Sequence, residues 1–327
     1  MKRAVVVLAV ASIVIAGLLP LWLSPFYIRV LQFFYFSAAL AIAWNILGGF
    51  AGYWSFGHTV FIGIGGFASG HLVMRLGTFG PPPFSMILPI LFSGFVSAAL
   101  AAIVAYPLLR LRGIYFAIAM LGVAQVTSEL VNNIGWFQGG IGVFLPPALP
   151  AGLAPERFYY YIFGGFLILC FAISVAVKHS RLGYGLIAIR EDEDTARMLG
   201  IPTEQFKIAA FVLSAALIGM LGAVYSYSVG YFTTSTLFRI DFSLNMIVYS
   251  LIGGLGTLFG PVVGAAIMLS VTQILLSRLL EVHLLITGAI VVAIVLLMPN
   301  GIIGTMRNRF RGGARGSPEA ATAGEGP

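Results

Sequence analysis

Residues 84–109 read FSMILPILFSGFVSAALAAIVAYPLL, a run of 26 residues without Asp, Glu, Lys or Arg. About 20 apolar residues are enough for a helix that crosses the hydrocarbon core of a bilayer. The rest of the chain is similar, because 59% of its 327 residues are hydrophobic, 9% are charged and the mean hydropathy is +1.00. A soluble protein needs more polar surface than this. The composition therefore predicts an all-α polytopic membrane protein.

Apolar windows predict about ten transmembrane helices. They lie near residues 4–23, 27–47, 53–74, 84–109, 113–133, 158–177, 207–231, 241–259, 261–280 and 283–299. With the N-terminus inside, the inner segments hold thirteen Lys and Arg residues and the outer segments five. Basic residues favour the cytoplasmic side, so we expect both termini in the cytoplasm.

The two ends of the chain carry separate signals. The start, MKRAVVVLAVASIVIAGLLPLWL, resembles a signal peptide, but no polar cleavage region follows it, so we expect an uncleaved first span. Residues 1–304 are expected to form one transmembrane domain, and residues 305–327 a polar, disordered cytoplasmic tail. The single Cys170 excludes a disulfide framework and a cysteine metal site. The net charge of +7 is accounted for by membrane orientation.

Residues 188–211, AIREDEDTARMLGIPTEQFKIAAF, form a charged segment in an otherwise apolar chain. The ten-span count places this segment in the cytoplasm. A short helix is expected over residues 188–199, with acids in its first turns where the helix dipole favours them. Two pairs of opposite charge four residues apart support this helix: Arg190 with Asp194 and Glu193 with Arg197.

The end of this helix is marked by Gly200, which supplies a left-handed cap, and Pro202, which prevents continuation. Apolar residues form a small patch between the charges: Ala196, Met198, Leu199 and Ile201. A helix that is too short to be stable alone and has an apolar face suits docking into a groove on a partner. The alternative is a solvated cytoplasmic loop.

The heptapeptide DTARMLG (194–200) is similar to the Glu-Ala-Ala-x-x-x-Gly loop that importer permeases of the ABC class insert into their ATPase subunits. It departs from that loop at Asp194 and Thr195. Five longer stretches resemble the branched-chain amino acid permease family, in particular its M-type subunit. They are residues 48–67, 107–126, 182–225, 253–265 and 298–304, in that order.

The resemblance implies a non-enzymatic permease subunit of an importer in the inner membrane of a prokaryote. With a second, homologous permease it would form the path for branched-chain amino acids, beside two ATPase subunits and an extracytoplasmic solute-binding protein. Permeases for urea or short-chain amides look alike. ATP and Mg²⁺ would bind the ATPase subunits, since a P-loop needs a lysine after glycine and none of Lys2, Lys178 and Lys207 follows one.

The resemblance also implies an ATPase-coupling loop at about residues 178–206. Its expected site residues are Arg190, Glu191, Glu193, Asp194, Ala196, Arg197, Met198, Leu199 and Gly200. Polar residues inside spans are costly and tend to face a cavity or a neighbouring helix. The candidates for the translocation path are Asn45, His58, Gln125, Glu129 and Asn245.

Two features leave alternatives open. Glycines at helix-packing spacing, such as Gly66 with Gly70 and Gly256 with Gly260 and Gly264, favour close helix approach over a broken-helix binding site. A secondary transporter or channel would have the same composition, although it would have no need of the charged segment. A membrane enzyme is disfavoured, because the sequence contains neither His-Glu-x-x-His nor Gly-x-Ser-x-Gly.

Overall fold

A computed structural model of the chain describes residues 17–78, 80–150 and 152–275. In chain order its elements are η1 (Leu19–Leu21), α2 (Pro25–Leu47), α3 (Thr59–Leu76), η2 (Phe84–Met86), α4 (Ile87–Leu108), α5 (Ile114–Asn133), β1 (Val143–Phe144), α6 (Pro155–Lys178), α7 (Arg181–Glu191), α8 (Glu193–Met198), α9 (Thr203–Val229), β2 (Tyr231–Phe232), α10 (Thr234–Leu237), α11 (Ile240–Gly253), α12 (Gly260–Leu269) and η3 (Ser270–Leu275). Most of the first expected span (residues 4–16), the span near 283–299 and the tail at 305–327 lie outside the described residues.

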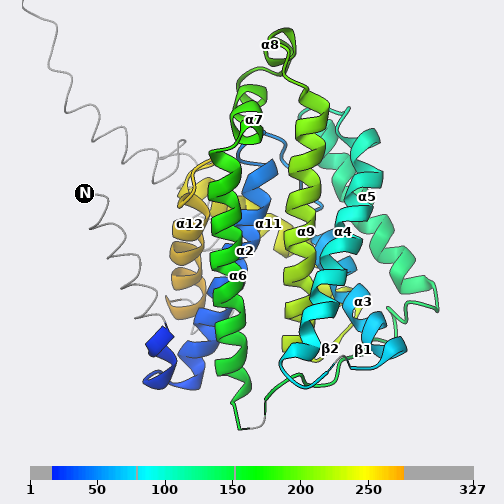
Figure 1. The fold of residues 1–327 in the computed structure, drawn as a ribbon, viewed down its shortest axis with the longest axis vertical. Helices are drawn as coiled ribbons and strands as arrows, with labels where there is room; N and C mark the ends of the chain where they lie inside the picture. Colours follow the sequence, from blue (N-terminus) through cyan, green and yellow to red (C-terminus); the bar gives the residue numbers. More distant parts are fainter. Residues whose placement is uncertain (1–16, 79, 151, 276–327) are drawn as a thin grey trace, which may run out of the picture.

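Within the described residues, six helices are long and apolar enough to cross a membrane: α2, α3, η2 with α4, α5, α6 and α9. They run alternately up and down between two ends of the molecule (Figure 1). We call these the α8 end and the β end, after α8 and the antiparallel pair β1 and β2. The prediction of an all-α polytopic membrane protein is thereby confirmed.

Two of the expected spans are shorter than the sequence predicts. The one near 241–259 is the 14-residue α11, and the one near 261–280 is the 10-residue α12, which continues into the π-helical η3. The loop 254–259 between them turns through glycines with positive φ, Gly254 and Gly256, at the α8 end. A hydropathy window counts these apolar loop residues as helix, which explains the difference.

The span expected at 53–74 also begins later, at Thr59. The preceding loop 48–58 is irregular and largely buried, and the Trp44 indole donates to the Ser55 carbonyl oxygen at 2.9 Å. Irregular backbone inside a membrane is tolerated where protein groups cover it and satisfy its hydrogen bonds. The aromatic side chains of this loop made it look like a span in the sequence.

The helix α3 starts inside the helix layer rather than at its edge. His58, directly before it, lies 3.2 Å from the hydroxyl of Ser214, eleven residues into α9. The backbone N–H of Thr59 donates to the hydroxyl of Ser243 near the start of α11 at 2.8 Å. The first turns of α3 and α11 therefore meet at depth.

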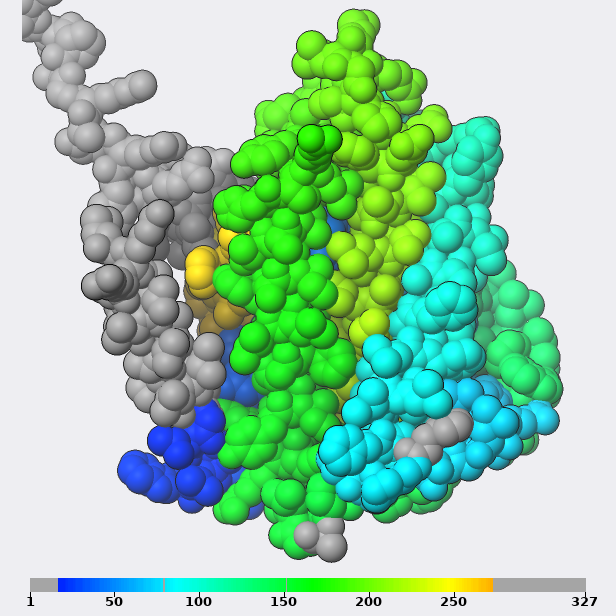
Figure 2. Space-filling view, in the orientation of Figure 1, coloured from blue at the N-terminus to red at the C-terminus, as the bar shows by residue number. Residues whose placement is uncertain are grey.

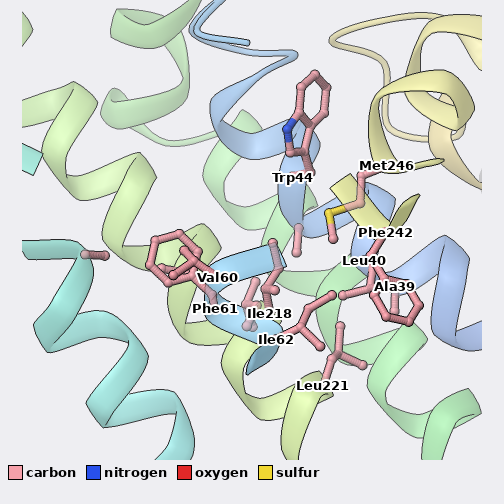
Figure 3. Packing of buried hydrophobic residues seen from close by; sticks show 14 of the residues in the cluster. Ala39, Leu40, Trp44, Val60, Phe61, Ile62, Ile218, Leu221, Phe242 and Met246 are labelled. Atoms are coloured by element: carbon pink, nitrogen blue, oxygen red, sulfur yellow. The ribbon is translucent and has the colours of Figure 1, made fainter. Parts of the chain in front are cut away.

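The core lies where α2, α3, α9 and α11 pack together, and Figure 3 shows large side chains from all four, including Trp44, Phe61 and Met246. Helices α3 and α9 approach closely, because a Cβ on Gly65 or Gly222 would overlap the backbone of the other helix. The predicted use of glycines for close packing is thus supported.

Candidate functional site at the α8 end

The charged segment forms two helices, not the single helix that we expected over residues 188–199. The chain breaks at Asp192, which has extended backbone angles (φ −160°, ψ 114°) and ends α7. Its side chain accepts a hydrogen bond from the N–H of Thr195 at 2.6 Å and so caps the start of α8. Glu193 and Asp194 occupy the first turn of α8, where acids are favourable.

Glu193 points into the protein and anchors α8. Its carboxylate lies 2.7 Å from the ammonium of Lys207 in the first turns of α9, and it accepts a 2.5 Å hydrogen bond from the hydroxyl of Tyr53. The side chains of Glu193 and Lys207 are only 10% and 3% exposed. Arg112 and Arg197 lie further away, at 3.8 and 3.7 Å.

The Lys207 ammonium uses all three of its donors. Besides Glu193 it donates to the Tyr53 hydroxyl at 2.9 Å and to the Leu109 carbonyl at 3.1 Å. A buried ion pair is stable only when its remaining hydrogen-bonding groups are also satisfied, and here they are. Burial alone would raise the pKa of the Glu193 carboxyl, but the hydrogen bonds from Lys207 and Tyr53 outweigh it and hold that pKa below its ordinary value.

A second, exposed contact holds α8 to the loop between α4 and α5. Both terminal nitrogens of Arg112 donate to the carboxylate of Asp194, at 2.8 and 3.0 Å. This bidentate pair lowers the pKa of Asp194. Asp194 therefore pairs with Arg112 and not with Arg190, so the predicted Arg190–Asp194 pair is wrong, because the break at Asp192 separates the two residues.

Arg190 instead reaches the loop 48–58. Its guanidinium donates to the Gly49 carbonyl oxygen at 2.9 Å, 141 residues away in sequence. The same guanidinium lies over Gly256 in the α11–α12 loop, where a Cβ would overlap it. Lys178, at the end of α6, also donates to the Gly256 carbonyl at 3.4 Å.

The outward surface of α8 is apolar at its tip. Met198 and Leu199 are 87% and 76% exposed, and α8 projects from the end of the molecule (Figures 1 and 2). Gly200 follows with φ +83°, which confirms the predicted left-handed cap. Ala196 was expected on this surface, but it is buried, because it lies on the side of α8 that packs against the protein.

The five candidates for the translocation path lie in different surroundings. Asn45 is fully buried and donates to the Thr257 carbonyl while accepting from the N–H of Gly256, both at 3.0 Å. His58 is buried against Phe61 and Phe211. The described residues thus place these two candidates in internal packing.

The remaining three candidates lie in two helices. Gln125 and Glu129 are exposed on α5 and contact each other at 2.9 Å, and Asn133 also donates to Glu129. Asn245 is partly buried in α11. The five candidates therefore do not form one site in the described part of the chain.

A cavity of about 450 Å³ lies toward the β end between α2, α6 and α9. Aromatic side chains and an exposed Arg29–Glu156 ion pair of 2.6 Å line it. None of the five path candidates is among its described lining residues.

The sequence did not single out Tyr53, Arg112 or the inward role of Lys207 at the α8 end, because a tyrosine or a basic residue at a span end is expected at a membrane surface anyway.

The sequence from residue 26 to residue 296 matches the family model described as the branched-chain amino acid transport system permease component. The chain belongs to this permease family. It is therefore a multi-pass membrane protein of a family of transport components, and its α8 end is best considered in that context.

Individual relatives are similar at low identity. The chain is 26% identical to the high-affinity branched-chain amino acid transport system permease protein LivM of Escherichia coli strain K12, over 94% of this chain and 77% of the relative. It is 24% identical to the corresponding permease protein LivH of the same strain, over 82% and 91%. The autoinducer 2 import system permease protein LsrC of Yersinia enterocolitica is 24% identical over 51% and 46%. No solved structure matches the chain.

Proposed function

We propose that this chain is a permease subunit of an ATP-binding-cassette importer and that α8 is the element that docks into an ATPase subunit. The observation that carries the proposal is the projecting tip of α8, where Met198 and Leu199 are exposed on a helix that a buried ion pair holds in place. Exposed apolar side chains on a rigid element are typical of an interface anchor. Arg197 and Gly200 flank this tip in the chain and Glu191 ends α7, and we include all three among the docking residues.

The proposal includes a complete assembly. The chain crosses the membrane ten times with both termini in the cytoplasm, so that the α8 end faces the cytoplasm and residues 178–206 form the coupling loop. Residues 1–304 form the permease domain and 305–327 a cytoplasmic tail. A second permease completes the translocation path, two ATPase subunits bind ATP and Mg²⁺, and an extracytoplasmic binding protein delivers the solute. This chain itself catalyses no reaction.

Branched-chain amino acids are the proposed solutes, which the match to the family and the similarity to LivM and LivH support. Urea or a short-chain amide is the alternative. Uptake of radiolabelled leucine, urea and acetamide by vesicles that contain the complete transporter and its binding protein distinguishes them. Transport of urea or acetamide in place of leucine would contradict the branched-chain assignment.

The docking proposal is tested with Leu199→Asp and Met198→Asp. Burial of a Leu or Met side chain contributes about 1.5–3 kcal/mol, so loss of one anchor weakens ATPase association by roughly tenfold to a hundredfold. The measurement is co-purification of the ATPase subunits with the tagged chain from membranes. The matched control is Ile141→Asp, since Ile141 is 80% exposed toward the β end. Equal recovery of ATPase subunits with all three variants would refute docking through α8.

A further inference from the structure

Two inward contacts of the α7–α8 unit end on one segment, the loop 48–58. Arg190, in the last turn of α7, donates to the Gly49 carbonyl at 2.9 Å. Glu193, the first residue of α8, accepts the 2.5 Å hydrogen bond from Tyr53. These contacts lie on either side of the break at Asp192, so both helices of the unit are attached to the same loop.

Tyr53 has a central place in this arrangement. Its hydroxyl donates to Glu193 and accepts from Lys207, and its ring packs edge-on against Phe116 of α5 at 5.3 Å. The hydroxyl is therefore shared by the charged side chains of α8 and α9. Burial and the neighbouring Glu193 carboxylate both raise the pKa of Tyr53, so it stays a neutral donor.

The loop 48–58 leads from these contacts into the helix layer. It runs to Thr59, the first residue of α3, whose N–H donates to Ser243 of α11. At its other end Gly49 lies against Gly256 of the α11–α12 loop, and Asn45 ties α2 to that same loop. A displacement of this loop would therefore reach the starts of both α3 and α11.

We propose that Arg190 and Tyr53 are positioning residues that transmit movement of α8 to the loop 48–58 and from there to α3. The proposal rests on the docking of α8 proposed above and gives different roles to different residues of the segment. Met198 and Leu199 face outward and bind the partner. Arg190 and Glu193, which the sequence places in the same coupling loop, face inward and carry the displacement.

The geometry distinguishes this role from simple packing. A short helix could be held to α9 by the Glu193–Lys207 pair alone. The bond from Arg190 to Gly49 adds nothing to the α9 attachment, and the Tyr53 hydroxyl, which also completes the Glu193–Lys207 pair, ties that pair to the loop 48–58. Both bonds connect the α7–α8 unit to an irregular segment whose buried backbone is not part of a helix. A chain of hydrogen bonds between rigid helices and one irregular segment is a physical route for coupling.

The test uses Tyr53→Phe and Arg190→Met in the complete transporter. Tyr53→Phe keeps the ring on Phe116 and removes only the shared hydroxyl, and Arg190→Met keeps the aliphatic stem over Gly52. Both variants are expected to retain their ATPase subunits. The number of solute molecules transported per ATP hydrolysed is expected to fall at least about fivefold, the lower range of an allosteric coupling. The control is Arg29→Gln, which breaks an ion pair at the opposite end.

A second measurement follows the loop directly. Trp54→Cys, in a Cys170→Ala background, places a thiol at a partly exposed position beside Tyr53. Its rate of labelling by a maleimide is expected to change when ATP, Mg²⁺ and vanadate are added to the complete transporter. The change is expected to disappear when Tyr53→Phe and Arg190→Met are added to that background. A labelling rate that is unaffected by nucleotide would overturn the proposal.

The outcomes separate this inference from the docking proposal. Wild-type transport per ATP in both variants, with Leu199→Asp still losing its ATPase subunits, would overturn transmission and leave docking intact. Loss of ATPase subunits from Tyr53→Phe and Arg190→Met to the same extent as from Leu199→Asp would show that the contacts only shape α8, which also overturns transmission. If the ATPase subunits bind equally well with Leu199→Asp, docking itself fails.

Discussion

Asn45→Ala is expected to destabilise the protein, because the Asn45 amide joins α2 to the loop between α11 and α12. The side chain is fully buried, and its two 3.0 Å hydrogen bonds go to the Thr257 carbonyl and the Gly256 N–H. Removal of one partner leaves the other without its bond, at about 1–3 kcal/mol for each group. The two groups together predict a loss of about 2–6 kcal/mol of unfolding free energy.

The assay uses the single buried thiol of Cys170, which becomes accessible when the protein unfolds. A fluorogenic maleimide added to the detergent-solubilised chain during a temperature ramp reports the midpoint of unfolding. A loss of 1 kcal/mol lowers the midpoint by about 2–4 °C in a domain of 150–250 residues, so Asn45→Ala is expected to shift it by at least about 4 °C. Asn245→Ala is the matched control, since the side chain of Asn245 forms no hydrogen bond to another described residue.

The result also decides between two interpretations of Asn45. The sequence made it a candidate for the translocation path, whereas its hydrogen bonds make it part of the internal framework. A midpoint within about 1 °C of that of the unaltered chain would show that these bonds contribute nothing measurable to stability and refute the reasoning. Unchanged stability together with lost solute uptake would return Asn45 to the translocation path.

Three further predictions concern topology, packing and pH. In a Cys170→Ala background, Ile141→Cys is expected to react with an impermeant maleimide from outside intact cells, and Glu204→Cys only after the cells are opened. Gly253→Ala is expected to lower the unfolding midpoint, since a Cβ there would overlap the carbonyl of the first residue of α12, whereas Gly122→Ala meets open space and removes a helix glycine. The stabilisation by Glu193, whose folded pKa is lowered, is present at neutral pH and is lost as the pH falls through that pKa, so the protection of α8 amides against exchange, taken relative to the intrinsic exchange rate at each pH, is expected to fall in acid.

Each of these has an outcome that contradicts it. Labelling of both cysteines from the same face would refute the orientation. A Gly253→Ala protein as stable as the Gly122→Ala protein would show that the two short helices do not pack as closely as the structure has them. Amide exchange in α8 with the same acid dependence in Glu193→Gln would show that this carboxylate does not hold the helix.

The helices that follow from hydropathy alone were predictable from sequence. The charge-free residues 84–109 correspond to a helix, Phe84–Leu108, that is long and apolar enough to cross a membrane, and five other expected spans do the same. Hydropathy does not distinguish a helix from a buried irregular segment. The predicted span 53–74 therefore began before the observed start of α3 at Thr59, and the predicted span 241–259 included the loop 254–259. The protein largely buries the loop 48–58 and partly buries the loop 254–259, and such burial depends on segments that are distant in sequence.

The sequence predicted where the candidate site lies in the chain and how its helix is capped. It did not predict which of its side chains point into the protein and which point outward. Acidic residues, Gly200 and Pro202 marked a short capped helix correctly. The sequence did not predict that Asp192 ends α7 and caps α8, because an aspartate suits both the first turn of a helix and the position before it. The partner of Arg190 could not be predicted either, since the Gly49 carbonyl is a backbone group and every residue supplies one.

The break at Asp192 is what allows one short segment to serve two purposes. A continuous helix through residues 188–199 would place Arg190 beside Asp194 and satisfy both charges locally. With the chain extended at Asp192, Arg190 is free to reach Gly49, Asp194 pairs with Arg112, and Glu193 turns inward to Lys207. Most of the charges of the segment are thereby engaged in contacts within the chain, and the apolar side chains of Met198 and Leu199 are left at the tip. A partner that binds this tip would therefore bind an element that Arg190, Glu193 and Asp194 attach to the long helices or to the loops between them.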